Sequence, residues 1–216
     1  ILANVYLHYV LDLWFEKCIK KQLYGEAYLV RFADDFLIMF QYERDAQRVY
    51  EAVIKRMELF GLELSKEKTR ILPFGRYSVS RETFDFLGFT HFNSKTRKGY
   101  YTVGHKISRK KKKQFKSNLK KWVKENRNTQ FDEFMKALNK KLTGSFNYYS
   151  LSGMIREVRS LWIHSLYVTF KWLNRRSQRK SFKLERFYEI WNDRIIHPYI
   201  HVDIWSGDKV IYDKNV

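Results

Sequence analysis

The sequence predicts an α+β fold in two parts, antiparallel hairpins with helices followed by an all-helical bundle. Short runs of aromatic and branched residues alternate with turn residues up to Gly104, and helical apolar spacing dominates after it. Only two prolines and nine glycines interrupt the 216 residues, so no long linker divides them. The chain is 44% hydrophobic and 18% aromatic, which is enough to build a core and excludes wholesale disorder.

In the first part, apolar residues on nearly every turn of residues 2–18 predict a helix buried on more than one face. Two aromatic-rich runs, residues 27–32 and 36–40, are separated by Ala33, Asp34 and Asp35, which is typical of a hairpin with an acidic turn. Apolar residues at i, i+3 and i+4 from Asp45 onward then predict an amphipathic helix that stops at Gly61.

The remaining elements follow from shorter signals. Residues 62–64 and 69–72 are predicted to be short strands, and residues 83–92 and 99–103 a second hairpin that turns near Asn93. After Gly104 the spacing predicts helices over residues 108–125, 129–142, 155–174 and 184–193, with a loop bracketed by Gly144 and Gly153.

Positive charge is concentrated in the C-terminal half. The formal net charge is +19; residues 1–104 carry 16 Lys and Arg against 13 Asp and Glu, whereas residues 105–216 carry 26 against 10. Such a density repels itself unless a polyanion neutralises it, and nucleic acid is the commonest intracellular polyanion. An anionic membrane surface is the alternative, but the aromatic residues are interleaved with the basic ones, which favours nucleic acid.

The cellular compartment is indicated by three features that the sequence lacks, a membrane-spanning run, a secretion signal and paired cysteines. No apolar run approaches the roughly 18 residues that a membrane span needs, and no basic segment precedes the apolar opening as in a secretion signal. Cys18 is the single cysteine, which excludes an internal disulfide framework or thiolate zinc cluster. We therefore expect a reducing, cytoplasmic location and no membrane partner.

Asp34 and Asp35 are the candidate chemical site. Two adjacent anions between apolar strands are costly unless a cation or hydrogen-bond donors neutralise them, although aspartates are also common in ordinary solvated turns. Two-metal nucleotidyl transfer needs carboxylates that bridge Mg²⁺ ions about 3.5–4 Å apart. Successive strand side chains point to opposite faces, so only one of the pair can point straight into such a site. At least one further carboxylate is required.

Four segments occur in a fixed order and spacing. They are LANVYLH at residues 2–8, FADD at 32–35, GLELSKEKT at 61–69 and FDFLGF at 84–89. Together they resemble the palm of group II intron-encoded reverse transcriptases. LNKKLTGSFNYY at residues 138–149 resembles the start of the maturase-specific region, also called the thumb or X domain. The resemblance implies a partial polymerase palm over residues 1–104 and a thumb and maturase domain over residues 105–216.

The resemblance also implies a function. It indicates an RNA-directed DNA polymerase that helps its parent intron RNA fold and splice, with Mg²⁺ as cofactor and intron RNA, an RNA template, a DNA primer and dNTPs as partners. Asp34 would be a catalytic, metal-binding aspartate and Asp35 its less directly ligating neighbour. The other implied roles are nucleotide binding by Lys68 and primer binding by Phe86, Leu87 and Gly88.

The sequence departs from this family at its start. The family's fingers and first metal-binding aspartate would precede residue 1, and Asp12 and Glu16 lie too far along the first helix to replace that aspartate. We therefore expect no primer extension from this polypeptide alone with Mg²⁺.

A basic helix is the candidate RNA-binding element. At 100° per residue, Phe115, Leu119 and Val123 share one face and the lysines gather on the opposite face. A solvated lysine face is the plain alternative, but the run of basic residues before the helix adds charge that nearby acids cannot balance. The candidate RNA-binding residues are Arg109, Lys110, Lys113, Lys116, Lys120 and Lys124, with Arg175, Arg176 and Arg179 farther along the chain.

We expect these residues to contact phosphates, with strong salt dependence and little base specificity. The alternative function is a non-catalytic RNA-binding splicing cofactor in which the acidic turn is vestigial.

Overall fold

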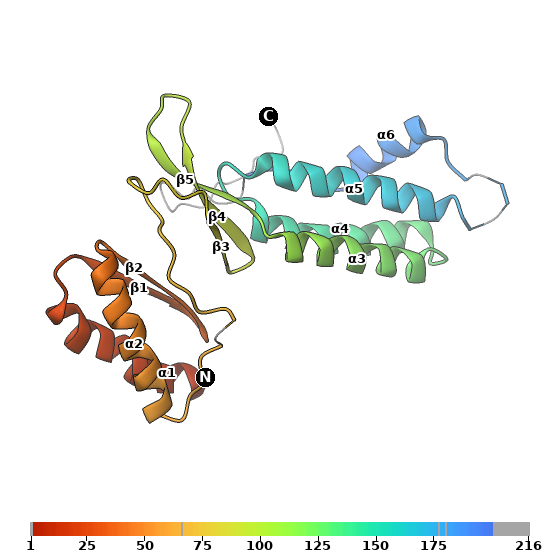
Figure 1. The fold of residues 1–216 in the computed structure, drawn as a ribbon. Coiled ribbons are helices and arrows are strands. Elements are labelled where there is room, and N and C mark those ends of the chain that lie inside the picture. The colour runs from red at the N-terminus through yellow and green to blue at the C-terminus, as the bar shows by residue number, and fades with distance from the viewer. Residues whose placement is uncertain (1, 66, 177, 180, 201–216) are drawn as a thin grey trace. The chain divides into compact units, whose positions relative to one another are not determined.

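The computed structural model of the chain describes residues 2–65, 67–176, 178–179 and 181–200 (Figure 1). These residues form an α+β protein with two small sheets and six α-helices, as the sequence predicts. They divide into an N-terminal unit, within residues 2–87 and 92–103, and a C-terminal unit, within residues 88–91 and 104–200. Among the described residues, no helix is both long and apolar enough to cross a membrane.

Helical structure extends from Leu2 to Gln22. It consists of α1 (Leu2–Leu7), the π-helical segments η1 (His8–Asp12) and η2 (Phe15–Ile19), and the 3₁₀ turn η3 (Lys20–Gln22). Val10, Leu11 and Phe15 are buried, but Leu2 is 85% exposed and Tyr9 65%. The prediction of a helix here is confirmed, and the expectation that it is buried on more than one face is wrong, because many of its apolar side chains reach solvent.

The first sheet is a hairpin of β1 (Ala27–Phe32) and β2 (Asp35–Phe40), with Phe32 opposite Asp35 and Ala27 opposite Phe40. It packs with the first helical stretch and with α2 (Glu43–Leu59), and this confirms the predicted hairpin and amphipathic helix. The core that these elements share consists of Val10, Leu11, Phe15, Ala27, Val49, Val53 and Met57.

A buried carboxylate fixes the start of β1 against the start of α2. Asp45 is 1% exposed and accepts hydrogen bonds from the backbone amides of Tyr24 (3.0 Å) and Gly25 (3.1 Å). A Cβ atom on Gly25 would lie 2.6 Å from the Tyr42 ring, so only glycine fits there without a shift of that ring. This anchor ties the residues before β1 to the first turn of α2.

The segments 62–64 and 69–72 are not strands, which corrects the prediction. Leu62 and Leu64 pack against the core of the N-terminal unit. Their alternation with exposed residues therefore reflects burial of one side of an extended segment and not pairing in a sheet.

The second sheet has the order β3-β4-β5, with β3 (Thr83–Phe86), β4 (Phe89–Lys95) and β5 (Tyr101–Ile107). The strand predicted over residues 83–92 is divided by a two-residue turn at Leu87 (φ +50°) and Gly88 (φ +82°). The prediction of a turn near Asn93 is wrong, because Asn93 lies inside β4. Glycine adopts positive φ without steric cost, and that allows a tight turn where other turn-forming residues are lacking.

The C-terminal unit is helical after β5, as predicted. Its helices are α3 (Arg109–Asn126), α4 (Phe131–Tyr149), α5 (Ile155–Leu173) and α6 (Leu184–Arg194), and α3, α4 and α5 lie side by side in Figure 1. α4 continues through Gly144, where the sequence predicts a loop. Leu142 and Phe146, four residues apart on one helix face, are both fully buried, and this burial outweighs the low helix propensity of glycine.

Candidate functional site

Asp34 and Asp35 lie at the tip of the β1-β2 hairpin. Ala33 and Asp34 form its two-residue turn, and Asp35 is the first residue of β2. Ala33 has φ +56°, a conformation that primed hairpin turns require and that glycine usually supplies. Ala33, Asp34 and Asp35 are all exposed, so both carboxylates are accessible to solvent at the tip.

The two aspartates differ in their place on the hairpin. The side of β2 that packs on the core carries Phe36, Ile38 and Phe40. Because strand side chains alternate, Asp35 lies on the other side, opposite Phe32, whose side chain is 65% exposed. Asp34 belongs to the turn itself, so its position depends directly on the backbone conformation of Ala33.

Arg31 supports the turn from the core-facing side, and sequence reasoning missed it. Its Nε and Nη2 donate to the two carboxylate oxygens of Asp12 at 2.8 and 2.7 Å, and its Nη1 donates to the Ala33 carbonyl at 2.8 Å. The hydrogen bond from Arg31 lowers the pKa of Asp12 from its usual value, against a smaller opposing effect of burial. Arg31 lies on the same side of β1 as Ala27 and Leu29, the side that faces the core. A cation at such a position is costly to bury without an acidic partner, so its place in the strand could have indicated one.

The acidic turn fits a divalent metal only in part. Carboxylate oxygens are the ligands that Mg²⁺ prefers, and Asp34 and Asp35 offer them to solvent. Within the described ranges, however, no group of three or more His, Cys, Asp or Glu residues could hold a metal ion. Asp12 is engaged by Arg31. Within the described residues the turn therefore supplies two carboxylates toward a metal site, and Mg²⁺ is commonly held by one or two carboxylates together with substrate phosphates and waters.

The other predicted palm residues lie on turns. Lys68 is exposed, and its backbone amide donates to the Ser65 carbonyl at 3.0 Å. Phe86 ends β3, and Leu87 and Gly88 form the turn into β4. The Gly88 carbonyl accepts a hydrogen bond from the Ser108 amide at 3.0 Å, immediately before α3.

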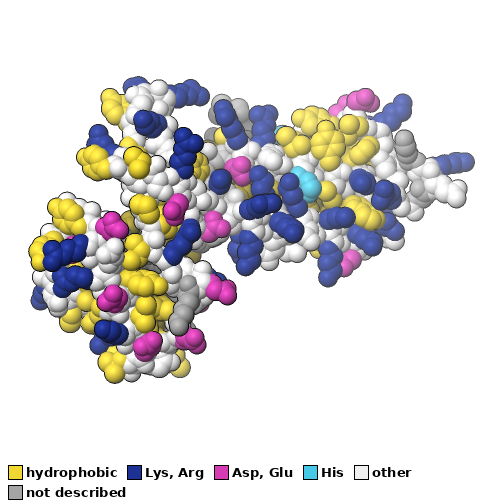
Figure 2. All heavy atoms as spheres, viewed as in Figure 1, with side chains coloured by type: hydrophobic (Ala, Val, Ile, Leu, Met, Phe, Trp, Pro, Cys, Tyr) yellow, Lys and Arg dark blue, Asp and Glu magenta, His cyan; other side chains and the backbone are white. Residues whose placement is uncertain are grey.

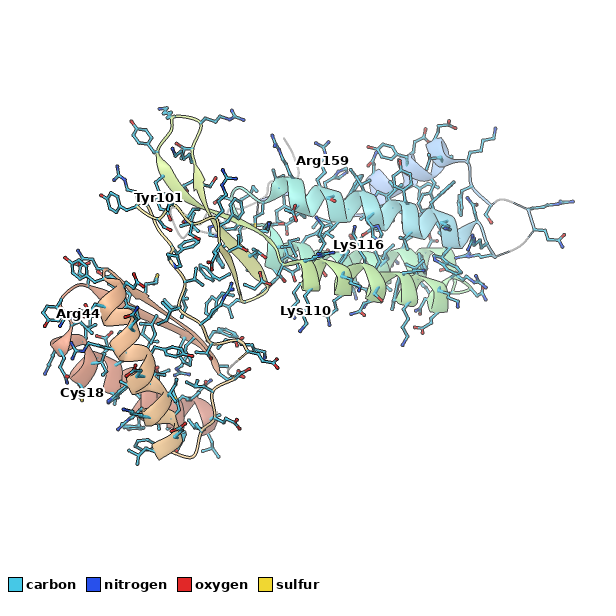
Figure 3. The ribbon with its side chains drawn as sticks, in the orientation of Figure 1. Cys18, Arg44, Tyr101, Lys110, Lys116 and Arg159 are labelled. Carbon is cyan, nitrogen blue, oxygen red and sulfur yellow. The ribbon has the colours of Figure 1, made fainter. Side chains whose placement is uncertain are left out.

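The predicted lysine face of α3 is open to solvent over most of its length. Figure 2 shows Lys and Arg side chains gathered over the helical bundle, and Figure 3 labels Lys110 and Lys116 on α3 and Arg159 on α5. The exposed members of the predicted set on this helix are Arg109, Lys110, Lys113, Lys120 and Lys124, whereas Lys116 is half-buried. Burial lowers the pKa of His164 on α5, and the nearby charge of Lys116 on α3 lowers it further, so both effects favour the neutral imidazole.

Three cations surround Trp172, near the end of α5. Lys124, Arg127 and Arg175 lie 5.8, 5.4 and 5.4 Å from its ring centroid. Sequence reasoning missed Arg127, although it follows Lys124 by three residues and so lies on the same side of the helix end.

The remaining predicted arginines differ from each other. Arg176 is half-buried, and burial lowers its pKa; within the described part of the chain its Nε and Nη2 are buried without a hydrogen-bond partner. Arg179 is exposed. Lys180, which belongs to the same basic cluster of the sequence, lies outside the described residues.

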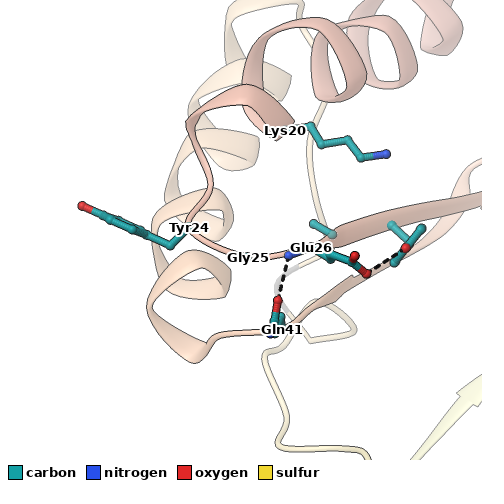
Figure 4. Close-up of a pocket in the computed structure, with 7 residues that line it drawn as sticks. Lys20, Tyr24, Gly25, Glu26 and Gln41 are labelled. Carbon is teal, nitrogen blue, oxygen red and sulfur yellow. Dashed lines mark hydrogen bonds between the residues drawn. The ribbon is translucent and has the colours of Figure 1, made fainter.

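A shallow, open pocket lies away from the acidic turn. Its volume is about 400 Å³, and it opens where β1 begins and β2 ends (Figure 4). The length of the hairpin therefore separates it from the tip. The lining residues are Lys20, Tyr24, Gly25, Glu26, Ala27, Tyr28 and Gln41. Two of these lining residues contact each other, because the Tyr28 hydroxyl donates a hydrogen bond of 2.9 Å to the Glu26 carboxylate.

Comparison with known proteins found a likeness for the N-terminal part of the chain. Residues 1–91 match the family model described as reverse transcriptase (RNA-dependent DNA polymerase). The match includes the first helical stretch, the acidic turn, α2 and the Leu87–Gly88 turn. This part of the chain is therefore similar to RNA-directed DNA polymerases, which use a divalent metal, typically Mg²⁺. No curated protein matches the sequence.

Proposed function

We propose that this chain carries part of the catalytic centre and the RNA-binding thumb of a reverse transcriptase and maturase of the group II intron type. The observation that carries the proposal is the solvent-exposed pair Asp34 and Asp35 on a constrained turn, inside the segment that matches reverse transcriptases. In this proposal residues 1–104 are the partial palm and residues 105–216 the thumb and maturase domain.

The proposed reaction is template-directed nucleotidyl transfer. When bound, two Mg²⁺ ions would activate the primer hydroxyl and stabilise the charge of the triphosphate. Asp34 would bind metal at the tip of the hairpin, and Asp35 would assist from the start of β2. Lys68 would meet the incoming nucleotide, and the turn formed by Phe86, Leu87 and Gly88 would support the primer end.

The test replaces Asp34 by Asn in the full-length protein. We expect cDNA synthesis on an RNA template with Mg²⁺ to fall by about a hundredfold or more, since the metal that this carboxylate would hold contributes several kcal/mol of charge stabilisation in the transition state. Glu51→Gln is the matched control, because Glu51 is an exposed carboxylate on α2 in the same unit. Equal synthesis by Asp34→Asn and the control would remove Asp34 from the catalytic centre.

A second candidate, a non-catalytic RNA-binding splicing cofactor, is favoured by the charge of the C-terminal half. The lysine face of α3 and the cations around Trp172 would then contact RNA phosphates, and the acidic turn would have no catalytic role. Intact splicing after loss of cDNA synthesis in Asp34→Asn would separate the two activities. Splicing without any detectable cDNA synthesis by the unmodified protein would favour the cofactor.

Replacing Lys113, Lys116, Lys120 and Lys124 by Gln tests the RNA surface. Each phosphate contact contributes about 0.7 to 0.9 to the slope of log affinity against log salt, so the slope should flatten by about 3. The matched control replaces four exposed lysines of the N-terminal unit, Lys17, Lys21, Lys55 and Lys98, which removes the same charge. An equal change of slope in both variants would show a nonspecific effect of net charge and contradict the assignment.

A further inference from the structure

Arg31 joins the first helical stretch to the acidic turn. Its side chain is 12% exposed and that of Asp12 is 25% exposed, and both atoms of the carboxylate are used in a bidentate pair. A cation at a largely buried position is costly unless it is paired and hydrogen-bonded. Asp12 meets that requirement from the end of η1, so the guanidinium is held in one orientation.

The remaining donors of Arg31 reach the turn. Nη1 donates to the Ala33 carbonyl at 2.8 Å and to the side-chain oxygen of Asn4 at 3.1 Å. The Ala33 carbonyl belongs to the peptide group that links Ala33 to Asp34. The guanidinium therefore binds the Ala33–Asp34 peptide through Nη1, which Asn4 shares, while Asp12 holds it through Nε and Nη2.

The conformation that Arg31 contacts is a strained one. Ala33 has φ +56°, and a left-handed conformation costs an L-amino acid roughly 1–2 kcal/mol. The turn is exposed, so apolar packing contributes little to hold it. The hydrogen bond from Arg31 favours this conformation over the relaxed alternatives, and it does so without using the carboxylates of Asp34 or Asp35.

We infer that Arg31, oriented by Asp12, is a positioning residue that fixes the Ala33–Asp34 peptide and thereby the place of the Asp34 carboxylate. The structural part of this inference stands on the contacts above, and its catalytic consequence rests on the proposed function. Catalytic groups must be held within about 0.5 Å of their productive positions. A looser turn should therefore slow the reaction although both carboxylates, Asp34 and Asp35, are still present.

The geometry of arginine is what the position requires. The planar fork contacts Asp12 through two nitrogens and Ala33 through a third. Lysine keeps the charge but has one nitrogen on a flexible chain, so it cannot reproduce this set of contacts. Arg31→Lys therefore separates a role of geometry from a role of charge.

The first test measures the turn directly in this chain by ¹⁵N relaxation of the Ala33, Asp34 and Asp35 amides. We expect order parameters to fall from about 0.85 towards 0.6 in Arg31→Lys and in Asp12→Asn. Arg48→Lys is the control, since Arg48 is exposed on α2. Asp12→Asn decides the outcome if Arg31→Lys fails to fold. Turn amides as rigid as in the unmodified chain would overturn the inference, whatever the activity.

The second test measures polymerase kinetics in the full-length protein. We expect Arg31→Lys to lower kcat by about tenfold or more while the KM for dNTP stays within about twofold, because misplacement affects the reaction and not nucleotide binding. A loosened turn with unchanged kcat would overturn the positioning role. Full activity of Asp34→Asn would instead overturn the proposed function, and the relaxation result would still decide the contacts of Arg31.

Discussion

The hairpin turns at Ala33 and at Leu87 are held by different means. Among the described residues, Ala33 and Leu87 are the only non-glycine residues at positive φ, and each lies in one of these turns. The turn at Ala33 is exposed and is bound by the side chain of Arg31. At the other turn Leu87 is half-buried and is followed by Gly88, whose carbonyl accepts from the Ser108 amide.

The comparison shows that a backbone with positive φ can be stabilised either by glycine and a backbone hydrogen bond or by a side-chain contact. At Leu87 and Gly88 the conformation depends on glycine and on a backbone hydrogen bond, so it is part of the fold of the sheet. At Ala33 it depends on one guanidinium and its partner Asp12, which leaves both carboxylates of the turn accessible. A side-chain contact can be removed by a conservative substitution, and the first turn is therefore the one whose function can be altered with little change of fold.

The largest expected effect is at Gly88. Gly88→Val places a β-branched residue at φ +82° and should lower the free energy of unfolding by about 2 kcal/mol. The nearest atom to an added Cβ would be Lys111 Cγ at 3.5 Å, so the cost comes from the backbone and not from a clash. Urea unfolding measures the change.

The control for this variant is Gly144→Ala. Gly144 lies inside α4, and an added Cβ would meet nothing within 4 Å, so alanine should stabilise by about 1 kcal/mol. A Gly88→Val variant as stable as the unmodified chain would show that the second turn does not depend on glycine.

A smaller effect is expected for Asp12→Asn, which removes the charge that orients Arg31. The hydrogen bond from Arg31 lowers the pKa of Asp12 in the folded state. The carboxylate therefore stabilises the fold above its unfolded pKa, and the contribution is lost as the pH falls through the folded pKa. We expect a loss of about 1 kcal/mol at pH 7 that shrinks below about pH 4. Denaturation at several pH values measures it, and a difference independent of pH would contradict the ion-pair explanation.

The smallest effect is expected for Ala33→Gly. Glycine relieves the cost of φ +56° but adds conformational entropy to the unfolded chain, so the net stabilisation should be about 0.5 kcal/mol. Ala137→Gly on the exposed face of α4 serves as the control and should destabilise by about 1 kcal/mol. Thermal unfolding distinguishes the two, and equal destabilisation would show that Ala33 is not strained in solution.

Local patterns predicted much of the fold. The spacing in α2, α3 and α5 and the aromatic runs of β1 and β2 were sufficient, because each element buries one face of its own sequence. Two predictions were wrong because burial of side chains, and not the local pattern, decided the backbone structure. Leu62 and Leu64 alternate like a strand but pack on the core, and α4 continues through Gly144 because Leu142 and Phe146 are buried on either side of it.

The candidate site was predictable in part. FADD at residues 32–35 identified the two carboxylates, and the lysines of α3 followed from helical geometry. Arg31 lies beside the same motif, but its partners Asp12 and Asn4 are 19 and 27 residues away. Contacts between residues so distant along the chain depend on how helix and hairpin pack together.

The sequence by itself determined the class of elements, the acidic pair at a turn and the segregation of positive charge, because periodicity, turn chemistry and charge are local properties. Only the tertiary structure decided which cation supports the acidic turn, where the chain turns between β3 and β4, and which arginine side chains are exposed to solvent. These depend on burial, and the free energy of burying a charge or a side chain is set by neighbours that the order of residues does not reveal.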